Sequence, residues 1–574
     1  MTAAIQTLWA AQLARTLADA GIATCVVSPG SRSTPLVAAL AREPRLDLPS
    51  IIDERAAAFF ALGEARASGR PVALVCTSGT AAAHYLPAIV EASLAGVPLV
   101  AITADRPPEL QHCGASQTVD QVKLYGGFVR GAFDLGAPVA DALAFRAVHA
   151  TLAQAIALAR GPLPGPVHIN VPLRKPLEPA APSTELEHAL AKLVAAPITA
   201  VVAPPRLLAD AGALDALARS IAAEPCGAIV VGAMPVAFGA AREIVAALAE
   251  RTGYPVIAEV GSQVRSHSTI HHFDLIAAQA HAPRLVIQLG AEPVGAAWPA
   301  WLAASSAARW VLAETWSDPA ASARVVIGDV AMSLRDLGAR LAPDGGTAHR
   351  RDATVDYKAS WHALDRRAAA AIAMALETHP TSETAAIRAA IGAAGDATLQ
   401  IGNSLPIRVV EHAIGDAGAR AVITQRGTAG IDGLVASAGG ATRAGKPVLL
   451  VLGDVSFAHD VGGLLAARRS RAPLAILVVD NGGGQIFSGL PVAHAQLGAA
   501  FATHFTTAPE LDPVAVAHAF GARGVLARSP GAVATAVAAA LATPGATIIH
   551  APVSASGAHD VRRAALESLA PRGS

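Results

Sequence analysis

Short runs of apolar residues recur along the chain, and each ends in a turn of small or polar residues. In the first third these runs occupy 25–27, 72–76, 98–103 and 166–171, and alanine-rich segments of helical length separate them. Continuous apolar runs of this length, bounded by small-residue turns, are typical of strands buried on both faces of a parallel sheet. Strands that alternate with helices predict a doubly wound α/β domain.

The same alternation returns twice further along the chain. The strands expected there are 228–232, 255–259, 285–289, 310–313, 398–401, 421–424, 447–452, 474–479 and 547–550. Proline-rich or polar stretches, at 174–205 and from 343–346 onward, separate the three regions and are expected to be linkers. We therefore predict an α/β protein with three doubly wound parallel-sheet domains, at residues 1–180, 200–342 and 354–574.

Composition narrows the class of protein. The 574 residues exceed what one core organises, and 53% apolar with 15% charged residues is typical of a well-buried globular chain. Lys+Arg and Asp+Glu are 44 each, so no basic field predicts a nucleic-acid or anionic-membrane partner. The four cysteines lack CxxC spacing, which argues against a zinc or disulfide framework and favours a reducing compartment. Because we find neither a signal peptide nor an uninterrupted apolar run of membrane-spanning length, we expect a cytoplasmic protein.

One βαβ pattern carries the strongest chemical signal. The apolar runs 447–452 and 474–479 end in Gly453-Asp454 and in Asp480-Asn481 with three glycines, and a segment long enough for one crossover helix joins them. A right-handed crossover places both strand ends at one edge of the sheet, so Asp454 and Asn481 are expected to face each other. An acid and an amide offer oxygen ligands to a hard cation such as Mg²⁺, which usually also carries phosphate. Spacing alone leaves open a helix-capping Asp and an Asn-Gly turn.

Eight motifs in register identify a family. They are 28–36 (SPGSRSTPL), 53–60 (DERAAAFF), 76–81 (CTSGTA), 103–110 (TADRPPEL), 114–118 (GASQT), 402–406 (GNSLP), 426–433 (RGTAGIDG) and 453–487, from GDVSFAHD to NGGGQIF. Together they resemble the 2-succinyl-5-enolpyruvyl-6-hydroxy-3-cyclohexene-1-carboxylate (SEPHCHC) synthases, thiamine-diphosphate-dependent transferases of menaquinone biosynthesis. The resemblance covers the first and third regions in order and is weaker in the middle region and at the C-terminus.

The resemblance implies three domains of the thiamine-diphosphate-enzyme type, which are a pyrimidine-binding domain, a middle domain and a diphosphate- and Mg²⁺-binding domain. It implies thiamine diphosphate with Mg²⁺, or Mn²⁺, as cofactors, and 2-oxoglutarate and isochorismate as substrates. It also implies a homodimer or a dimer of dimers with active sites between subunits. The alternative is another thiamine-diphosphate 2-oxoacid decarboxylase or carboligase, similar to acetolactate synthase. The presence of Glu54, Asp454 and Asn481 argues against an inactive paralogue, and no GxGxxG after a strand or GxxxxGK[ST] suggests a nicotinamide enzyme or an NTPase.

Motif matches also imply site residues. Glu54 would exchange a proton with the cofactor's aminopyrimidine, which requires a dry pocket and a raised pKa, although the residues alone fit a helix cap or a partner of Arg55. The implied catalytic residues are Glu54, Ser31, Arg32 and Gln117. The implied metal ligands are Asp454, Asn481 and the Gly483 carbonyl. The further cofactor contacts are Ser404, Thr428, Ile431 (an apolar wedge), Ser456 and Ile486.

The substrates of this family are anions, and arginine forks suit carboxylates better than lysine does. The implied substrate-binding residues are Ser31, Arg32, Arg106, Gln117, Ser404, Arg408, Arg426, Phe487 and Leu490, of which Leu490 fits a core position equally well. His459-Asp460 is interpreted as structural, because adjacent helical residues do not face each other. Ala296 and Ala297 stand where the family usually carries basic residues, so we expect acceptor binding to rest on Arg32, Arg106 and Arg426. The expected consequence is either a raised KM for isochorismate or another arginine in place of the missing cation.

Overall fold

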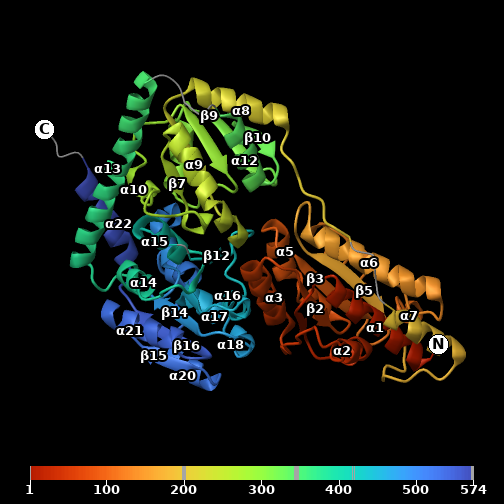
Figure 1. The fold of residues 1–574 in the computed structure, drawn as a ribbon. Coiled ribbons are helices and arrows are strands. Elements are labelled where there is room, and N and C mark those ends of the chain that lie inside the picture. The colour runs from red at the N-terminus through yellow and green to blue at the C-terminus, as the bar shows by residue number, and fades with distance from the viewer. Residues whose placement is uncertain (1, 197–201, 342–347, 417, 419, 571–574) are drawn as a thin grey trace. The chain divides into compact units, whose positions relative to one another are not determined.

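Three parallel β-sheets organise the computed structural model, which describes residues 2–196, 202–341, 348–416, 418 and 420–570 (Figure 1). The strand orders are β1-β2-β3-β5-β4, β10-β9-β8-β6-β7 and β12-β11-β13-β14-β16-β15. All strand pairs within these sheets are parallel. The expected α/β class with parallel sheets is confirmed.

The chain forms two compact units, each with its own cores. The first unit comprises Met1–Arg206, Gln425–Ala444 and Asp460–Arg471, and the second comprises Leu207–Thr424, Gly445–His459 and Ala472–Ser574. The first unit therefore holds the first sheet together with two short segments from the third region of the sequence, while the second unit holds the other two sheets.

The strands of the first unit are β1 (Cys25–Val27), β2 (Val72–Cys76), β3 (Leu99–Asp105), β4 (Ala132–Asp134) and β5 (Val167–Pro172). Its helices are α1 (Ala3–Asp19), α2 (Thr34–Leu40), α3 (Glu54–Ser68), α4 (Thr80–Ala83), α5 (Leu86–Leu94), α6 (Ala142–Arg160), α7 (Glu185–Ala195), α16 (Leu434–Ala441) and α18 (Gly463–Ala467).

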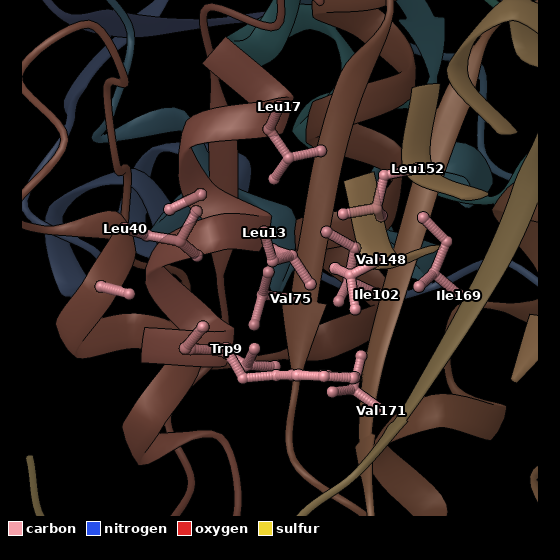
Figure 2. Packing of buried hydrophobic residues seen from close by; sticks show 14 of the residues in the cluster. Trp9, Leu13, Leu17, Leu40, Val75, Ile102, Val148, Leu152, Ile169 and Val171 are labelled. Carbon is pink, nitrogen blue, oxygen red and sulfur yellow. The ribbon is translucent and has the colours of Figure 1, made fainter. Parts of the chain in front are cut away.

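Successive strand residues of the first sheet serve two different cores, as the alternation of a β-strand requires. One core contains Val75 and Ile102 with side chains from α1, α2, α6 and α7, and Figure 2 shows strand and helix residues of this cluster packed together. The other contains Leu74 and Ala101 with α3 and α5. Full burial of one such aliphatic side chain contributes roughly 1.5–3 kcal/mol. Both faces of the sheet are therefore covered.

Helix α6 is the one helix among the described residues that is long and apolar enough to cross a bilayer by length and composition. Its side chains Phe145, Val148 and Leu152 are buried in the core that contains α1. Packing in this core is sufficient reason for its apolar character.

The second unit contains the middle sheet and the third sheet. The strands are β6 (Gly227–Val231), β7 (Val256–Ala258), β8 (Leu285–Leu289), β9 (Ala308–Ala313), β10 (Ala323–Ile327), β11 (Thr398–Ile401), β12 (Val422–Thr424), β13 (Val448–Gly453), β14 (Leu474–Asp480), β15 (Arg523–Leu526) and β16 (Ala546–Pro552). The helices are α8 (Ala211–Ala223), α9 (Arg242–Thr252), α10 (Phe273–Ile276), α11 (Ala297–Ala304), α12 (Val330–Arg340), α13 (Ala348–Thr378), α14 (Glu383–Gly392), α15 (Leu405–Ala413), α17 (Asp454–His459), α19 (Ala499–Phe501), α20 (Pro513–Ala519), α21 (Pro530–Leu541) and α22 (Gly557–Leu569).

The structure corrects several local expectations. The proline-rich stretch 174–205 contains helix α7, which a capping box between Thr184 and Glu187 starts. Residues 343–346 lie outside the described residues, but the polar stretch after them begins α13 instead of extending a linker. The crossover between β13 and β14 is not one helix, because α17 and α18 share it.

Helix α16 receives its N-terminal cap from a distant residue. A capping side chain at Gly433 is excluded because this residue has φ +59° and a Cβ there would lie 1.9 Å from the Phe59 ring. Instead the Asp460 carboxylate accepts hydrogen bonds from Val435 N (2.7 Å) and Ala436 N (3.0 Å). Burial raises the pKa of Asp460 to about 7, and the nearby Asp53 and Asp432 carboxylates add to the rise. These contacts agree with the structural interpretation of Asp460.

Replacing Asp460 by Asn should change how stability depends on pH. The pKa of Asp460 is raised to about 7, so the folded protein holds a proton that the unfolded chain releases, and unfolding becomes easier as pH rises from about 4 to about 7. An amide oxygen still accepts both bonds but does not titrate. We expect the Tm of Asp460→Asn, relative to that of wild type, to increase by a few degrees as the pH is raised from about 5 to about 8. Circular dichroism measures both Tm values. A constant Tm difference at all pH values would contradict the assignment.

Candidate functional site

The ends of β13 and β14 lie side by side in register. Leu452 is opposite Val478 and Gly453 is opposite Val479, so Asp454 and Asn481 follow at the same edge of the sheet. The parallel pairing of these two buried strands was predicted and is confirmed. Strand β11 pairs with β12 on one side and with β13 on the other, so the order of the sheet reverses between β11 and β13, beside the strand end that leads into Asp454. Such switch points, at the carboxyl ends of the strands, are where open α/β sheets bind ligands.

Two buried oxygen atoms at this edge lack partners. Asp454 Oδ1 accepts a hydrogen bond from Val455 N at 2.9 Å, but Asp454 Oδ2 and Asn481 Oδ1 have no hydrogen-bond partner among the described residues. Burial raises the pKa of Asp454 to about 6, and the nearby Asp480 carboxylate adds to the rise. An unsatisfied buried polar atom is costly, and a cation bound between the two oxygens would satisfy both.

The Asn481 amide is oriented by a residue that no sequence motif indicated. Asn481 Nδ2 donates to Glu383 Oε2 at 2.9 Å, which leaves Asn481 Oδ1 on the other side of the amide. Glu383 is 1% exposed, and burial raises its pKa to about 7. In the sequence it stands at the start of α14, after the N-cap Ser382, where an acidic residue is ordinary for a helix. The sequence therefore gave no reason to single it out.

The glycines after Asn481 form a turn that tolerates no side chain at Gly483. Gly483 has φ +119°, and a Cβ there would lie 2.3 Å from the Thr506 carbonyl oxygen. Its own carbonyl accepts a hydrogen bond from Gln485 N at 2.8 Å. Because a carbonyl oxygen has two lone pairs, one further acceptor position remains.

The apolar residues of the motif that follows the turn differ in burial. Ile486 packs against the core of the third sheet, and the Phe487 ring meets the edge of Phe505 with centroids 5.5 Å apart. Leu490 is 43% exposed, which excludes the core position that its sequence context equally allowed. Ser456 is buried in α17.

Strained backbone marks three of the motif turns. Ser404, Gln117 and Ala429 have positive φ values of +69°, +55° and +58°. This conformation costs a non-glycine residue of order 1–3 kcal/mol and concentrates at functional sites. Ser404 also accepts, through its carbonyl, a hydrogen bond from Arg408 Nη1 at 2.6 Å.

A cationic cluster lies in the first unit. Arg106 Nη1 donates to Ser78 Oγ at 2.8 Å, and Gln117 Nε2 donates to the Ser78 carbonyl at 3.0 Å. Arg32 is buried and its Nη1 donates to the Leu173 carbonyl at 2.6 Å, while its Nε has no acceptor among the described residues. Burial lowers the pKa of Arg32, and the nearby Arg106 lowers it further.

This cluster combines residues that the motifs had singled out with one that they had not. Arg32, Arg106 and Gln117 were predicted. Ser31, also predicted, is exposed and accepts a hydrogen bond from Thr34 N through its carbonyl. Ser78, which connects Arg106 with Gln117, was missed although it lies in the 76–81 motif. Small hydroxyl residues in such turns are usually local caps.

Glu54 begins α3 but does not cap it. Asp53 is the N-cap, since its carboxylate accepts from Arg55 N at 2.9 Å and pairs with Arg55 Nη2 at 2.7 Å. Both structural alternatives for Glu54, a helix cap and a partner of Arg55, are therefore taken by Asp53. The Glu54 side chain is 18% exposed and lies 3.9 Å from His84 Nδ1. The Glu54 side chain is therefore largely, but not fully, buried within its own unit.

The 426–433 motif forms a turn in the first unit. Thr428 donates through both its backbone N and its Oγ1 to the buried carboxylate of Glu91. Arg426 and Ile431 are half-buried. Each unit thus carries part of the predicted set of residues. The first unit holds Glu54, Arg32, Arg106 and Arg426, and the second holds Arg408 and the Asp454–Asn481 edge.

Comparison with known proteins defines the class. The profile described as "Thiamine pyrophosphate enzyme, N-terminal TPP binding domain" matches residues 9–124, and the corresponding C-terminal TPP binding domain matches 407–551. The fold is similar to benzoylformate decarboxylase from Polynucleobacter necessarius, with TM-score 0.72, 16% identity and coverage of 95% of this chain and 98% of that chain. A putative thiamin diphosphate-dependent enzyme from Mycobacterium smegmatis gives TM-score 0.68 and 18% identity, over 94% and 98% of the two chains. The chain is a thiamine-diphosphate-dependent enzyme.

The particular family follows from closer relatives. The chain is 40% identical to 2-succinyl-5-enolpyruvyl-6-hydroxy-3-cyclohexene-1-carboxylate synthase of Sorangium cellulosum, over 96% of this chain and 93% of the relative. It is 38% identical to the synthase of Halobacterium salinarum, over 99% and 98%, and 39% identical to that of Myxococcus xanthus, over 93% and 92%. The chain belongs to the family of SEPHCHC synthases, which confirms the resemblance inferred from the motifs.

Two adjacent glycines provide a matched test of the turn after Asn481. Gly482 (φ +78°) and Gly483 (φ +119°) are both left-handed, but a Cβ meets nothing within 4 Å at Gly482 and meets Thr506 at Gly483. We expect Gly483→Ala to weaken thiamine diphosphate binding by roughly tenfold or more, and Gly482→Ala to weaken it distinctly less, because only the former forces the turn to move. Calorimetric titration with the cofactor measures both. Equal losses would contradict a role for the close contact.

Proposed function

We propose that the chain decarboxylates 2-oxoglutarate and adds the remaining carbon skeleton to isochorismate, giving SEPHCHC in menaquinone biosynthesis. Relatives that bear the name of this synthase, at 38–40% identity over nearly the whole chain, support this reaction. The structural observation that carries it is a pair of buried oxygens, Asp454 Oδ2 and Asn481 Oδ1, that find no hydrogen-bond partner in the described part of the chain. Both residues lie in the stretch that matches a cofactor-binding domain.

The proposed metal is Mg²⁺, with Mn²⁺ as a substitute, held by Asp454, Asn481 and the Gly483 carbonyl. The donor set fits a hard cation, because all three groups offer oxygen. No group of three or more His, Cys, Asp or Glu side chains suited to a metal occurs among the described residues, so a softer transition-metal centre has no support there. Magnesium in turn would hold the diphosphate of the cofactor at the switch point.

Glu54 is the proposed acid and base. When bound, thiamine diphosphate would supply the carbon nucleophile and the electron sink that decarboxylation of a 2-oxo acid needs. The Glu54 carboxyl would donate a proton to, and take it back from, the cofactor's pyrimidine ring, which is why a carboxylic acid and not its amide is required at this position. Ile431 and Ile486 would pack on the cofactor, and Ser404, Thr428 and Ser456 would contact it.

The arginines are the proposed carboxylate-binding groups. Arg32 is buried with its Nε unpartnered among the described residues, and Arg106 lies close enough to lower its pKa. Two adjacent guanidinium groups suit acids with several carboxylates better than a small monocarboxylate, which favours this reaction over the acetolactate-synthase-like alternative. Arg408, Arg426, Ser31, Gln117, Phe487 and Leu490 complete the proposed substrate set.

Ala296 and Ala297 can offer a substrate carboxylate only backbone groups, because an alanine side chain carries no hydrogen-bond donor. The N–H groups of Ala296 and Ala297 donate to the Asp274 carboxylate at 3.1 and 2.9 Å, so this stretch starts a helix. Acceptor binding would therefore rest on Arg32, Arg106 and Arg426.

We further propose a homodimer or dimer of dimers in the cytoplasm, with the site completed by another subunit. The 18% exposure of the Glu54 side chain supports this, because proton exchange at this carboxyl requires a drier environment than its own unit supplies. The described cysteines are all free thiols, as a reducing compartment requires.

A product assay tests the reaction. Purified protein incubated with thiamine diphosphate, Mg²⁺, 2-oxoglutarate and isochorismate should yield a product with the mass of SEPHCHC. Glu54→Gln should keep the fold and the cofactor yet lose turnover by ~10²–10⁴-fold, because the amide cannot exchange the required proton. Release of carbon dioxide without the isochorismate adduct would favour the carboligase alternative. Near-normal turnover in Glu54→Gln would refute the role of Glu54.

Asp454→Ala tests the metal anchor. Removal of the carboxylate should abolish the Mg²⁺-dependent part of thiamine diphosphate affinity while the apoprotein stays folded, because one of the two unpartnered oxygens is lost. Asp512→Ala is the control, since Asp512 caps α20 in the same unit through Val514 N at 2.8 Å. Cofactor titrations with and without Mg²⁺ measure the effect. Unchanged affinity in Asp454→Ala would remove this residue from the site.

A further inference from the structure

A buried carboxylate that lies outside all the motifs, that of Glu91, forms hydrogen bonds to the 426–433 motif. Glu91 lies on α5 and is 1% exposed. Its Oε1 accepts a hydrogen bond from Gly427 N at 3.0 Å. Its Oε2 accepts from Thr428 N at 2.6 Å and from Thr428 Oγ1 at 2.8 Å. Both oxygens of one side chain therefore bind a single turn, which directly follows Arg426.

An ion pair accompanies the burial of this carboxylate. Arg66 Nη2 donates to Glu91 Oε1 at 2.7 Å, and the Arg66 side chain is only 9% exposed. A buried charge is tolerated when an opposite charge and further hydrogen bonds satisfy it. Glu91 meets both conditions, since one cation and three donors from the turn surround it.

The turn is pressed against α5 and cannot relax easily. A Cβ at Gly427 would lie 2.7 Å from the Glu91 carbonyl oxygen and 3.0 Å from Ala95 N. Ala429 has φ +58°, a strained conformation for a residue with a side chain. Gln425 Nε2 donates to the Asp432 carbonyl at 2.7 Å, which closes the turn from within. Contacts on both sides thus hold the backbone between Arg426 and Ile431 in one conformation.

We propose that Glu91 is a positioning residue for the active site, which fixes the turn so that Arg426 reaches a substrate carboxylate and Ile431 reaches the cofactor. The inference rests on the proposed function, which supplies the roles of Arg426 and Ile431. Because a displacement of about 1 Å at a site can cost ~10²-fold in rate, loosening this turn should lower catalysis without removing any group that touches the substrate.

The test compares Glu91→Gln with a matched control. Glu64→Gln alters another buried carboxylate of the same unit, which accepts from Thr24 Oγ1 and from Arg443 Nε at 2.7 Å and does not contact the turn. Glu91→Asp keeps the charge beside Arg66 but shortens the side chain, so it serves if Glu91→Gln fails to fold.

The first readout is amide hydrogen exchange of the peptide that covers residues 425–433 in the apoprotein. Loss of a hydrogen bond to a charged acceptor should speed exchange of Gly427 and Thr428 by roughly 10–100-fold in the Glu91 variants and leave it unchanged in Glu64→Gln. The second readout is thiamine diphosphate affinity, and the third is kcat/KM for 2-oxoglutarate measured well below the Tm of each variant. We expect kcat/KM to fall ~10–100-fold in the Glu91 variants and by less than about twofold in the control.

Unchanged exchange in the Glu91 variants would overturn the inference, and so would faster exchange with normal kcat/KM and normal cofactor affinity. Parallel losses of kcat/KM in Glu64→Gln and Glu91→Gln would also overturn it, because they would trace the effect to general destabilisation. Failure of the wild type to form the SEPHCHC product would refute the proposed function instead. In that case exchange and cofactor affinity still decide whether Glu91 positions the turn.

Discussion

The in-register parallel pairing of β13 and β14 is the constraint on which the candidate site depends. Because the two strands end at the same level, the polar residues after them, Asp454 and Asn481, must share one buried edge. Ionised Asp is an acceptor only, and the Asn481 amide already donates to Glu383, so the two remaining oxygens cannot satisfy each other. Each unpaired buried acceptor costs about 1–3 kcal/mol. This free-energy cost falls at a position where a bound cation would remove it.

The motifs supply the candidate reacting and binding groups, whereas residues outside the motifs, or unremarkable within them, form the hydrogen bonds that orient these groups. Glu383 orients Asn481, Glu91 holds the turn after Arg426, and Ser78 connects Arg106 with Gln117. Such support is needed because several motif turns are strained, and a strained turn keeps its conformation only when surrounding contacts over-determine it. Preorganised sites depend on this outer layer as much as on the groups that touch the ligand.

The central strands could be predicted from the sequence because both of their faces are buried, which leaves uninterrupted apolar runs. The three strands that the pattern missed, β4, β10 and β15, all lie at the edge of a sheet and are partly exposed, so their sequences are mixed. In the site, Asp454 and Asn481 could be predicted because strand ends are local in sequence. Glu383 and Glu91 could not, because they contact their partners across about a hundred residues or more and each looks like an ordinary helix residue.

The sequence identifies Glu54 as a candidate but does not show what surrounds its side chain. The sequence DER offers two carboxylates at one helix start, and only the structure shows that Asp53 performs both the capping and the pairing with Arg55. Asp53 therefore takes both structural roles at the helix N-terminus that the sequence left open for Glu54. The proposed proton exchange near neutral pH needs a low-dielectric surrounding, whereas the Glu54 side chain keeps 18% of its surface exposed in the structure. The surroundings of Glu54 include residues distant in sequence, such as His84, so no local sequence pattern could show them.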